Sequence, residues 1–302
     1  MPPEGVPWKP HETMLSFEEI MRVVRIMAQL GIRKVKVTGG EPLVRRGVPA
    51  FIKKLKALPM IEKVTLTTNG LLLGSYMEEA ETFSPGSLPD GINISLNALD
   101  PQRYRRITRH EGTGPEAILH LIGLLLEKNI QVKLNCVPVR SFNEEEIIPL
   151  AVLARDREIA VRFIELMPLG SAAALQSIPG KEVETILEET FGPLTPFSGA
   201  CGNGPAVYYC LPGFAGKVGF IDAITHGFCG SCNRLRLTSE GFLKLCLSND
   251  LGLDLRELLR SGASDSELSL AITEAIAKKP SRHTFYAVQA ETHSGNMSAI
   301  GG

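Results

Sequence analysis

The chain has 302 residues, which is enough for a large core in one or two domains. Its hydrophobic content of 44%, charged content of 22% and net charge of −1 indicate a soluble globular protein and argue against nucleic acid as a partner. No apolar run approaches a membrane span and the first residues resemble no signal peptide, so we expect a cytoplasmic protein without a membrane partner.

Helical and strand-like patterns alternate through the first half of the chain. A capping box, Ser16-x-x-Glu19, begins the first helix, and further helical patterns cover 48–58, 115–129 and 143–156. Strand-like runs cover 34–38, 64–68, 92–96, 131–136 and 161–166. This alternation predicts βαβ units and a parallel sheet. Because the pattern breaks near Pro168, we expect an incomplete barrel or an open sheet, not a full eight-stranded barrel.

The pattern changes beyond this point. A helix is predicted over 181–191, and short strands over 208–211 and 217–221. Runs 234–238 and 242–247 form a predicted hairpin, and helices follow at 253–260 and 264–279, the second opened by the capping box Ser264-x-x-Glu267. We therefore predict a barrel domain over 1–170 and a C-terminal α+β domain over 171–302.

Polar side chains occupy one face of the predicted barrel strands. Lys36, Thr67, Ser95 and Lys133 alternate with apolar residues, and Arg162 interrupts an apolar run. Helices must cover the apolar face, so we expect the polar face to point into the barrel, where lysines without a ligand would be costly. The pattern favours an anionic ligand bound by Lys36, Lys133 and Arg162. The alternative is an open, water-exposed face.

Two glycine-containing motifs follow the first two strands, Thr38–Leu43 (TGGEPL) and Thr67–Gly70 (TTNG). Glycines let a ligand approach the backbone closely, and barrel active sites lie at the carboxyl ends of the strands. The position of the motifs therefore indicates a ligand site, although paired glycines are also common in turns.

Three cysteines lie close together in the C-terminal half: Cys229, Cys232 and Cys246. Two share one turn and the third lies in the predicted hairpin, which suits a soft metal or an iron–sulfur cluster. Three ligands would leave one iron of a cluster open, and the nearby Arg234 and Arg236 suggest that an anionic ligand binds there. The alternative is a structural zinc site closed by His226.

These motifs together resemble the GTP 3′,8-cyclase family of molybdenum cofactor biosynthesis, within the radical S-adenosylmethionine (SAM) superfamily. The resemblance covers essentially the whole chain. Besides the two glycine motifs, it is carried by Ile94–Leu96, Val132–Asn135, Val161–Pro168 (VRFIELMP), Phe228–Leu237 (FCGSCNRLRL) with Cys246, and Ile300–Gly302. It implies an α/β fold, an incomplete radical SAM barrel of the (β/α)6 type followed by an α+β iron–sulfur domain.

The resemblance implies a role for each matching position. Cys229, Cys232 and Cys246 would bind a 4Fe–4S cluster whose open iron contacts guanine. The GTP site would comprise Lys36, Thr67, Lys133, Arg162, Arg234, Leu235 and Arg236, of which Arg234 and Arg236 would also act in catalysis. SAM would contact Gly39, Gly40, Glu41, Ser95 and Met167. Gly301 and Gly302 would form a tail that reaches the active site, although frayed ends are common at any terminus.

The implied reaction converts GTP to (8S)-3′,8-cyclo-7,8-dihydroguanosine 5′-triphosphate. In the family, a reduced cluster cleaves SAM to a 5′-deoxyadenosyl radical, which takes the 3′ hydrogen of the ribose before C8 of guanine is attacked. The family's Cys-x3-Cys-x2-Cys motif, which binds that cluster, does not occur among the 302 residues. We therefore expect an N-terminally truncated chain that is unable to cleave SAM, and DNA upstream of Met1 that encodes the motif.

The resemblance also implies partners. These are GTP, SAM, a downstream cyclic pyranopterin monophosphate synthase and a second copy of the chain in a homodimer. Two alternatives stay open: a catalytically inactive nucleotide-binding iron–sulfur protein of the same family, and a zinc protein with an unrelated barrel function. Iron and sulfide content separates the zinc protein from the others, and radical production separates the active from the inactive family member.

Overall fold

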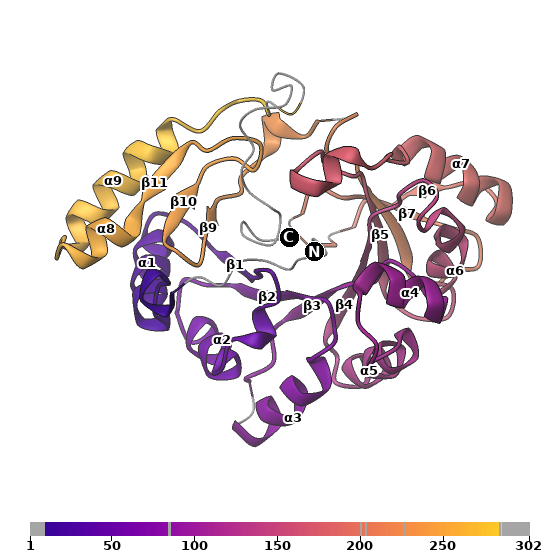
Figure 1. Cartoon of the computed structure of the whole chain (residues 1–302), viewed down its shortest axis with the longest axis horizontal. Coiled ribbons are helices and arrows are strands. Elements are labelled where there is room, and N and C mark those ends of the chain that lie inside the picture. The colour runs from indigo at the N-terminus through magenta and orange to yellow at the C-terminus, as the bar shows by residue number, and fades with distance from the viewer. Residues whose placement is uncertain are drawn as a thin grey trace. The chain divides into compact units, whose positions relative to one another are not determined.

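The computed structural model describes residues 10–83, 86–199, 201–202, 204–225, 227–283 and 285 (Figure 1). The chain divides into two compact units, each built from segments that are distant in the sequence. The first unit comprises residues 1–67, 75–90 and 229–302, and the second comprises 68–74 and 91–228. The domain boundary expected at residue 170 stays a prediction.

The second unit contains a parallel sheet extended by two antiparallel strands. Its parallel strands are, in spatial order, β3 (Gly91–Ser95), β4 (Gln131–Cys136), β5 (Ala160–Ile164) and β8 (Lys217–Ile221). The antiparallel strands β7 (Val207–Cys210) and β6 (Thr195–Pro196) then follow. We predicted β8 as a short strand outside the alternating pattern, but it pairs in parallel with β5. The sequence pattern does not reveal this pairing, because the connection from β5 to β8 contains a helix and the strands β6 and β7 and so departs from the regular spacing of the earlier strands.

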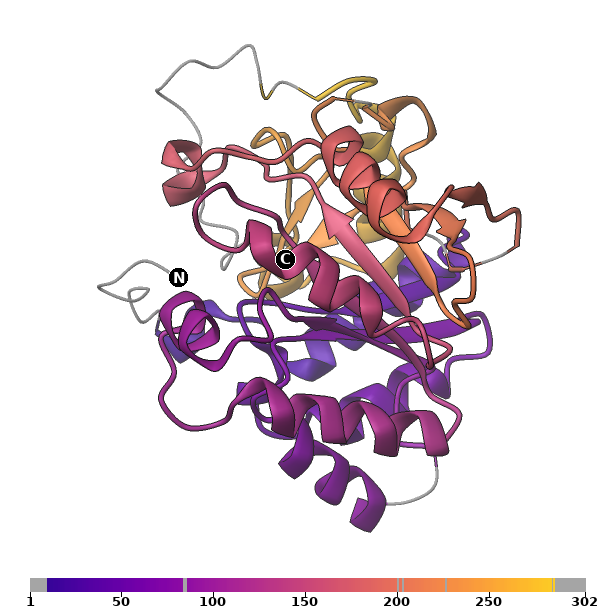
Figure 2. The ribbon, with the colours of Figure 1, turned by 90° about the vertical axis from the view of Figure 1, so that its right-hand side faces the viewer.

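Helices cover one face of this sheet (Figures 1 and 2). They are α4 (Pro101–Thr108), α5 (Pro115–Glu127), α6 (Ile147–Val152) and α7 (Gly180–Phe191), with the 3-10 helix η3 (Glu144–Glu146). A further 3-10 helix, η4 (Gly170–Ala174), lies in the connection after β5. The apolar side chains of β4 and α5 are buried, among them Val132, Leu134, Ile118 and Ile122. The polar residues of the same strands therefore occupy the other face, as the alternation predicted.

The first unit combines segments from the N-terminal and the C-terminal parts of the chain. Its earlier elements are η1 (His11–Thr13), α1 (Phe17–Gln29), β1 (Lys34–Val37), η2 (Pro42–Val44), α2 (Val48–Lys56), β2 (Lys63–Thr68) and most of α3 (Leu73–Phe83). Its later elements are η5 (Cys229–Ser231), β9 (Arg236–Leu237), β10 (Phe242–Lys244), β11 (Gly252–Asp254), α8 (Leu255–Arg260) and α9 (Asp265–Ala277). Strands β1 and β2 are parallel, whereas β9, β10 and β11 form an antiparallel sheet.

Helix α1 packs with the C-terminal helices in one hydrophobic core (Figure 1). The buried core residues are Leu15, Val23, Ile26, Leu243, Leu255, Leu259, Leu268 and Ile272. At the surface, Arg260 Nε donates to Glu19 Oε1 at 3.0 Å. The N-terminal helix therefore belongs to the framework that supports β10, the strand that leads to Cys246.

The predicted elements and the structure agree well where patterns are strong. Each predicted barrel strand occurs, and both capping boxes are present, at Ser16 and at Ser264. The helix predicted over 143–156 is shorter, because α6 ends at Val152 and the following residues make tighter turns. Helices α3 and α4 were not predicted. Only Tyr104 of α4 is buried, so that helix lacks the apolar stripe that signals a helix.

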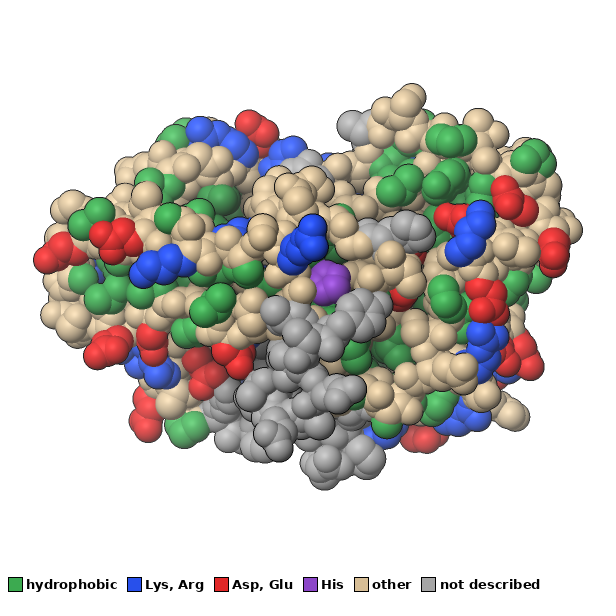
Figure 3. Space-filling view, turned by 90° about the horizontal axis from the view of Figure 1, so that it is seen from above, with side chains coloured by type: hydrophobic (Ala, Val, Ile, Leu, Met, Phe, Trp, Pro, Cys, Tyr) green, Lys and Arg blue, Asp and Glu red, His purple; other side chains and the backbone are tan. Residues whose placement is uncertain are grey.

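The surface reflects the balanced composition. On the described part of the face in Figure 3, acidic and basic side chains are interspersed. Within the described residues, every helix is too short or too polar to cross a membrane.

Candidate functional site

One row of paired residues crosses five strands of the second unit. Strand pairing places Asn135 opposite both Ser95 and Arg162. Gly219 in turn lies opposite both Arg162 and Tyr208. Residues that pair directly across a sheet project from the same face. The expected SAM residue Ser95 and the expected GTP residue Arg162 therefore share one face of the sheet.

Arg162 is a deeply buried cation. Its side chain is 4% exposed, and among the described residues no carboxylate pairs with it. Its Nη2 donates to Asn93 Oδ1 at 2.7 Å, it bonds to the Tyr208 side chain, and its Nε has no hydrogen-bond partner in the described part of the chain. Burial lowers the pKa of Arg162, although Tyr208 opposes this shift. An uncompensated buried charge is costly, so this guanidinium suits an anionic ligand.

Lys133 lies on the same face and is also buried. Its Nζ donates to the carbonyl oxygen of Cys201 and lies 5.7 Å from the ring centroid of Tyr208. Tyr208 thus contacts both expected phosphate-binding cations of this unit. Since Lys133 is 8% and Arg162 4% exposed, the alternative of an open, water-exposed face does not hold for these strands.

Gly219 makes room for this arrangement. A Cβ at this position would lie 2.8 Å from Cδ1 of Tyr208 and 3.4 Å from Cγ of Arg162. The sequence pattern indicates no role for Tyr208 or Gly219. Their relation to Arg162 depends on the pairing of β8 with β5, which the sequence pattern does not reveal.

A buried carboxylate, that of Glu146, accepts hydrogen bonds from the loop that follows Ser95. Glu146 is 2% exposed and accepts from the backbone N–H of Leu99 at 2.7 Å and of Asp100 at 3.3 Å. Its Oε1 also accepts from Arg103 Nη1 at 2.7 Å. Ser95 itself is half-buried at the end of β3. The carboxylate of Glu146 therefore holds the loop at the carboxyl end of β3.

The loop after β5 is held in a similar way. Met167, an expected SAM residue, is half-buried in this loop. Nearby, Glu165 is 5% exposed and accepts from the backbone N–H of Ile224 at 2.8 Å and of Thr225 at 3.0 Å. This carboxylate links the end of β5 to the segment that follows β8.

The motif Thr38–Leu43 lies in the first unit after β1, whereas Thr67–Gly70, at the end of β2, begins in the first unit and continues into the second. Glu41 Oε1 accepts from the backbone N–H of Leu43 at 3.0 Å and so caps η2, a structural role beside the expected SAM contact. Gly39 is half-buried, and Gly40 is exposed. Thr67 is 8% exposed, whereas Lys36 is exposed and pairs with Thr65.

The cysteines lie in the first unit on two neighbouring segments. Cys229 begins η5, the backbone N–H of Cys232 donates to its carbonyl at 3.1 Å, and Cys246 follows β10. Arg234 Nη2 lies 3.8 Å from Cys232 Sγ. Leu235 is half-buried and packs against the hydrophobic core of this unit.

Nearby cations favour the thiolate form of Cys232. Burial acts to raise the pKa of Cys232, but the backbone N–H and guanidinium of Arg234, with the ammonium of Lys279, lower it below its usual value. Burial and the adjacent Arg234 lower the pKa of Arg236, while the thiolates of Cys232 and Cys246 oppose that shift. Arg236 is thus close to both of these cysteines.

The donor set fits an iron–sulfur cluster. All three thiols are free and half-buried, and metal ligation requires the thiolate form that the Arg234 environment favours. Within the described residues, no three Cys, His, Asp or Glu side chains are already placed to hold a metal ion, so the ligand role of the cysteines stays a prediction. His226, Gly301 and Gly302 lie outside the described residues.

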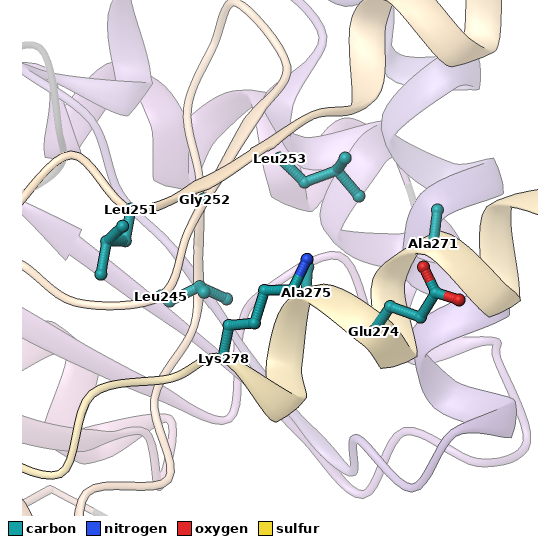
Figure 4. Close-up of a pocket in the computed structure, with 8 residues that line it drawn as sticks. All are labelled: Leu245, Leu251, Gly252, Leu253, Ala271, Glu274, Ala275 and Lys278. Atoms are coloured by element: carbon teal, nitrogen blue, oxygen red, sulfur yellow. The ribbon is translucent and has the colours of Figure 1, made fainter.

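A small pocket of about 180 Å³ lies between β11 and α9 of the first unit (Figure 4). It is lined by Leu245, Leu251, Gly252, Leu253, Ala271, Glu274, Ala275 and Lys278. Its mostly aliphatic lining contains none of the expected GTP or SAM residues. The pocket is therefore no candidate for the nucleotide site.

Comparisons with known proteins match both halves of the chain. The model of the Radical SAM superfamily matches residues 3–154, and the model named Molybdenum Cofactor Synthesis C matches residues 159–285. The chain resembles the crystal structure of Streptococcus suis SuiB bound to S-adenosylmethionine with a TM-score of 0.55, at 16% identity, over 83% of this chain and 59% of that chain. At this identity the likeness shows the fold alone, an α/β fold of the radical SAM type.

Curated relatives identify the family within this superfamily. A protein of Clostridium perfringens named GTP 3′,8-cyclase is 41% identical over 292 residues, which are 97% of this chain and 88% of the relative. A GTP 3′,8-cyclase of Pelotomaculum thermopropionicum is 42% identical over 306 residues, which are 100% of this chain and 92% of the relative. The chain belongs to the GTP 3′,8-cyclase family of the radical SAM superfamily.

Proposed function

We propose that this chain serves the GTP 3′,8-cyclase reaction, the conversion of GTP to (8S)-3′,8-cyclo-7,8-dihydroguanosine 5′-triphosphate in molybdenum cofactor biosynthesis. The single observation that carries the proposal is Arg162, buried on the sheet face beside Lys133 without an acidic partner among the described residues. A triphosphate would supply the missing negative charge, and the likeness to the cyclases supports GTP as its source.

The family resemblance implies which residues bind GTP. Lys133 and Arg162 would bind phosphate oxygens. Lys36 and Thr67 would contribute further polar contacts. Arg234, Leu235 and Arg236 line the site near the cysteines, and the two arginines also act in catalysis by stabilising negative charge on the nucleotide. Gly301 and Gly302 complete the site as a C-terminal tail.

The cofactors of the proposed reaction are SAM and an iron–sulfur cluster. Cys229, Cys232 and Cys246 would bind a 4Fe–4S cluster, and Gly39, Gly40, Glu41, Ser95 and Met167 would contact SAM. When bound, SAM and its reducing cluster supply the radical that takes the 3′ hydrogen from the ribose of GTP. The protein's own part is to orient ligands: Glu146 holds the loop next to Ser95, and Asn93 with Tyr208 orients the guanidinium of Arg162.

A polypeptide of these 302 residues offers cysteines for one cluster. The sequence contains six cysteines and no Cys-x3-Cys-x2-Cys motif. Cys136 is fully buried in the core, where burial raises the pKa of its thiol, so this residue suits no metal. We therefore expect this polypeptide by itself to bind the C-terminal cluster and GTP, but not to cleave SAM.

We further propose that the protein works in the cytoplasm, which the free thiols of all six cysteines support. A cyclic pyranopterin monophosphate synthase would act on its product. The chain would form a homodimer.

Calorimetric titration of GTP tests the proposal. In Arg162→Met and Arg234→Ala we expect GTP affinity to fall about ten- to a hundred-fold, because a charge-assisted hydrogen bond contributes about 1.5–3 kcal/mol. Arg157→Met replaces an exposed arginine of the second unit and should leave affinity unchanged. Wild-type affinity in both site variants would refute the nucleotide site.

A further inference from the structure

We propose that Lys279 is a positioning residue for the cysteine site: its ammonium joins the two backbone segments that bear Cys232 and Cys246. The inference rests on the proposed role of these cysteines as cluster ligands. It adds a residue outside the binding motifs, located just after the C-terminal end of α9.

The contacts of Lys279 reach both segments at once. Its Nζ donates to the carbonyl oxygen of Arg234 at 2.9 Å and to the carbonyl oxygen of Leu245. Arg234 follows Cys232 by two residues, and Leu245 directly precedes Cys246. One ammonium therefore sets the distance between two stretches of backbone that each bear a proposed ligand.

The contact with Leu245 also orients Cys246. A peptide group is planar, so a hydrogen bond to the Leu245 carbonyl fixes the plane that includes the N–H of Cys246. On its other side, the N–H of Leu245 donates to the carbonyl of Leu251 at 3.1 Å. Both peptide groups of Leu245 are therefore hydrogen-bonded, which restricts the backbone where the loop containing Cys246 begins.

Lys279 acts where the sheet no longer joins the two segments. The ladder between β9 and β10 pairs Leu237 with Leu243 and Arg236 with Lys244. The cysteines lie beyond that last pair, on the side where the ladder has ended. The two hydrogen bonds of Lys279 provide a cross-strand link at this point.

A simpler role for Lys279 is that of a cation at the end of a helix, which interacts favourably with the helix dipole. That role needs only the helix's own carbonyls, and the backbone N–H of Lys279 already donates to one of them, that of Ile276 at 2.9 Å. The side chain instead reaches carbonyls on two other segments. Its geometry is that of a clamp between segments.

The neighbouring Lys278 offers a matched control. It is exposed and lines the aliphatic pocket together with Leu245 and Glu274 (Figure 4). Both lysines follow the same helix and carry the same charge. Replacement of either by Met removes one positive charge near the end of α9, but only Lys279→Met removes the clamp.

The test measures the rate at which the reconstituted protein loses iron. Each variant of the full 302-residue chain is reconstituted anaerobically, and iron loss to a chelator is timed together with the electron paramagnetic resonance spectrum of the reduced protein. We expect Lys279→Met to lose iron about ten-fold faster than wild type or more, as is typical when a group that orients a ligand is removed. Lys278→Met should match wild type, and Lys279→Arg, which keeps the donors, should restore slow loss.

The outcomes separate the inference from the proposed function. Iron retained in Cys232→Ser and Cys246→Ser would refute the cysteines as ligands. Iron loss in those variants, with wild-type behaviour in Lys279→Met, would overturn only the role of Lys279. If Lys279→Met does not fold, as circular dichroism would show, Lys279→Arg decides: wild-type retention supports the clamp, and iron loss as fast as in Cys246→Ser overturns it.

Discussion

The ring of Tyr208 occupies the space that a side chain at Gly219 would need. The two residues pair across β7 and β8, and a Cβ at Gly219 would lie 2.8 Å from Cδ1 of that ring. The absent side chain lets Tyr208 lie against Arg162 and near Lys133. A glycine inside a strand thus determines how two buried cations are held.

We expect Gly219→Ala to lower the free energy of unfolding by about 1–3 kcal/mol, because overpacking displaces a buried ring. GTP affinity should fall with it. Gly123→Ala is the matched control, since a Cβ there meets nothing within 4 Å. In helix α5 this change should raise stability by about 0.5–1 kcal/mol. Denaturant titration measures both, and equal effects of the two substitutions would contradict the close packing at Gly219.

Arg162→Met is expected to change binding and stability in opposite directions. Replacement of an uncompensated buried charge by an apolar side chain of similar length is often neutral or stabilising by about 1–4 kcal/mol. The unfolding free energy without GTP should therefore stay level or rise, while GTP affinity falls. Thermal or denaturant unfolding without nucleotide checks this, and a loss above about 1 kcal/mol would show that Arg162 is a structural residue instead.

Two adjacent glutamates should differ sharply in importance. Both bond to Arg103, but the side chain of Glu146 is 2% exposed and that of Glu145 is 73% exposed. We expect Glu146→Gln to cost about 2–3 kcal/mol, because a buried carboxylate that accepts several hydrogen bonds is lost. Glu145→Gln should cost less than about 1 kcal/mol. The unfolding free energies of the two variants test this prediction. A similar cost for both would refute the role of Glu146 in holding the loop after β3.

The Arg140–Glu182 pair predicts a pH-dependent contribution to stability. Arg140 donates to both carboxylate oxygens of Glu182 at 2.8 Å, and these bonds lower the pKa of Glu182 from 4.5. A carboxyl whose pKa falls on folding stabilises the protein above its unfolded pKa, and this contribution is lost as the pH falls through the folded pKa. In Glu182→Gln, the unfolding free energy should therefore vary less below about pH 4.5.

Denaturant titrations across this pH range measure the effect, which should be small because both side chains are partly exposed to solvent. Glu189→Gln, at an exposed position of the same helix, serves as the control. An unchanged acid dependence in Glu182→Gln would mean that the pair contributes nothing to stability.

The sequence predicted much of the fold because local signals were strong. Capping boxes at Ser16 and Ser264 and the period-two strands are consistent over short windows, and both capping boxes and every predicted barrel strand occur. The pairing of β8 with β5 was beyond prediction, since it joins segments separated by a helix and two strands. Pairing over such a distance leaves no periodic trace in the sequence.

The same limit applies to the site. Lys133 and Arg162 were predicted from polar residues in apolar strands, and their burial supports their selection. Tyr208, Gly219 and Lys279 were missed because their importance comes only from contacts across the fold. A tyrosine in a strand and a lysine after a helix are ordinary features until their partners are known.

The iron and acid-labile sulfide content of the 302-residue chain after anaerobic reconstitution tests the proposed cluster most directly. We expect about four irons and about four sulfides per chain, which are lost when Cys229, Cys232 and Cys246 are replaced by serine. About eight irons, or tightly bound zinc without sulfide, would contradict it.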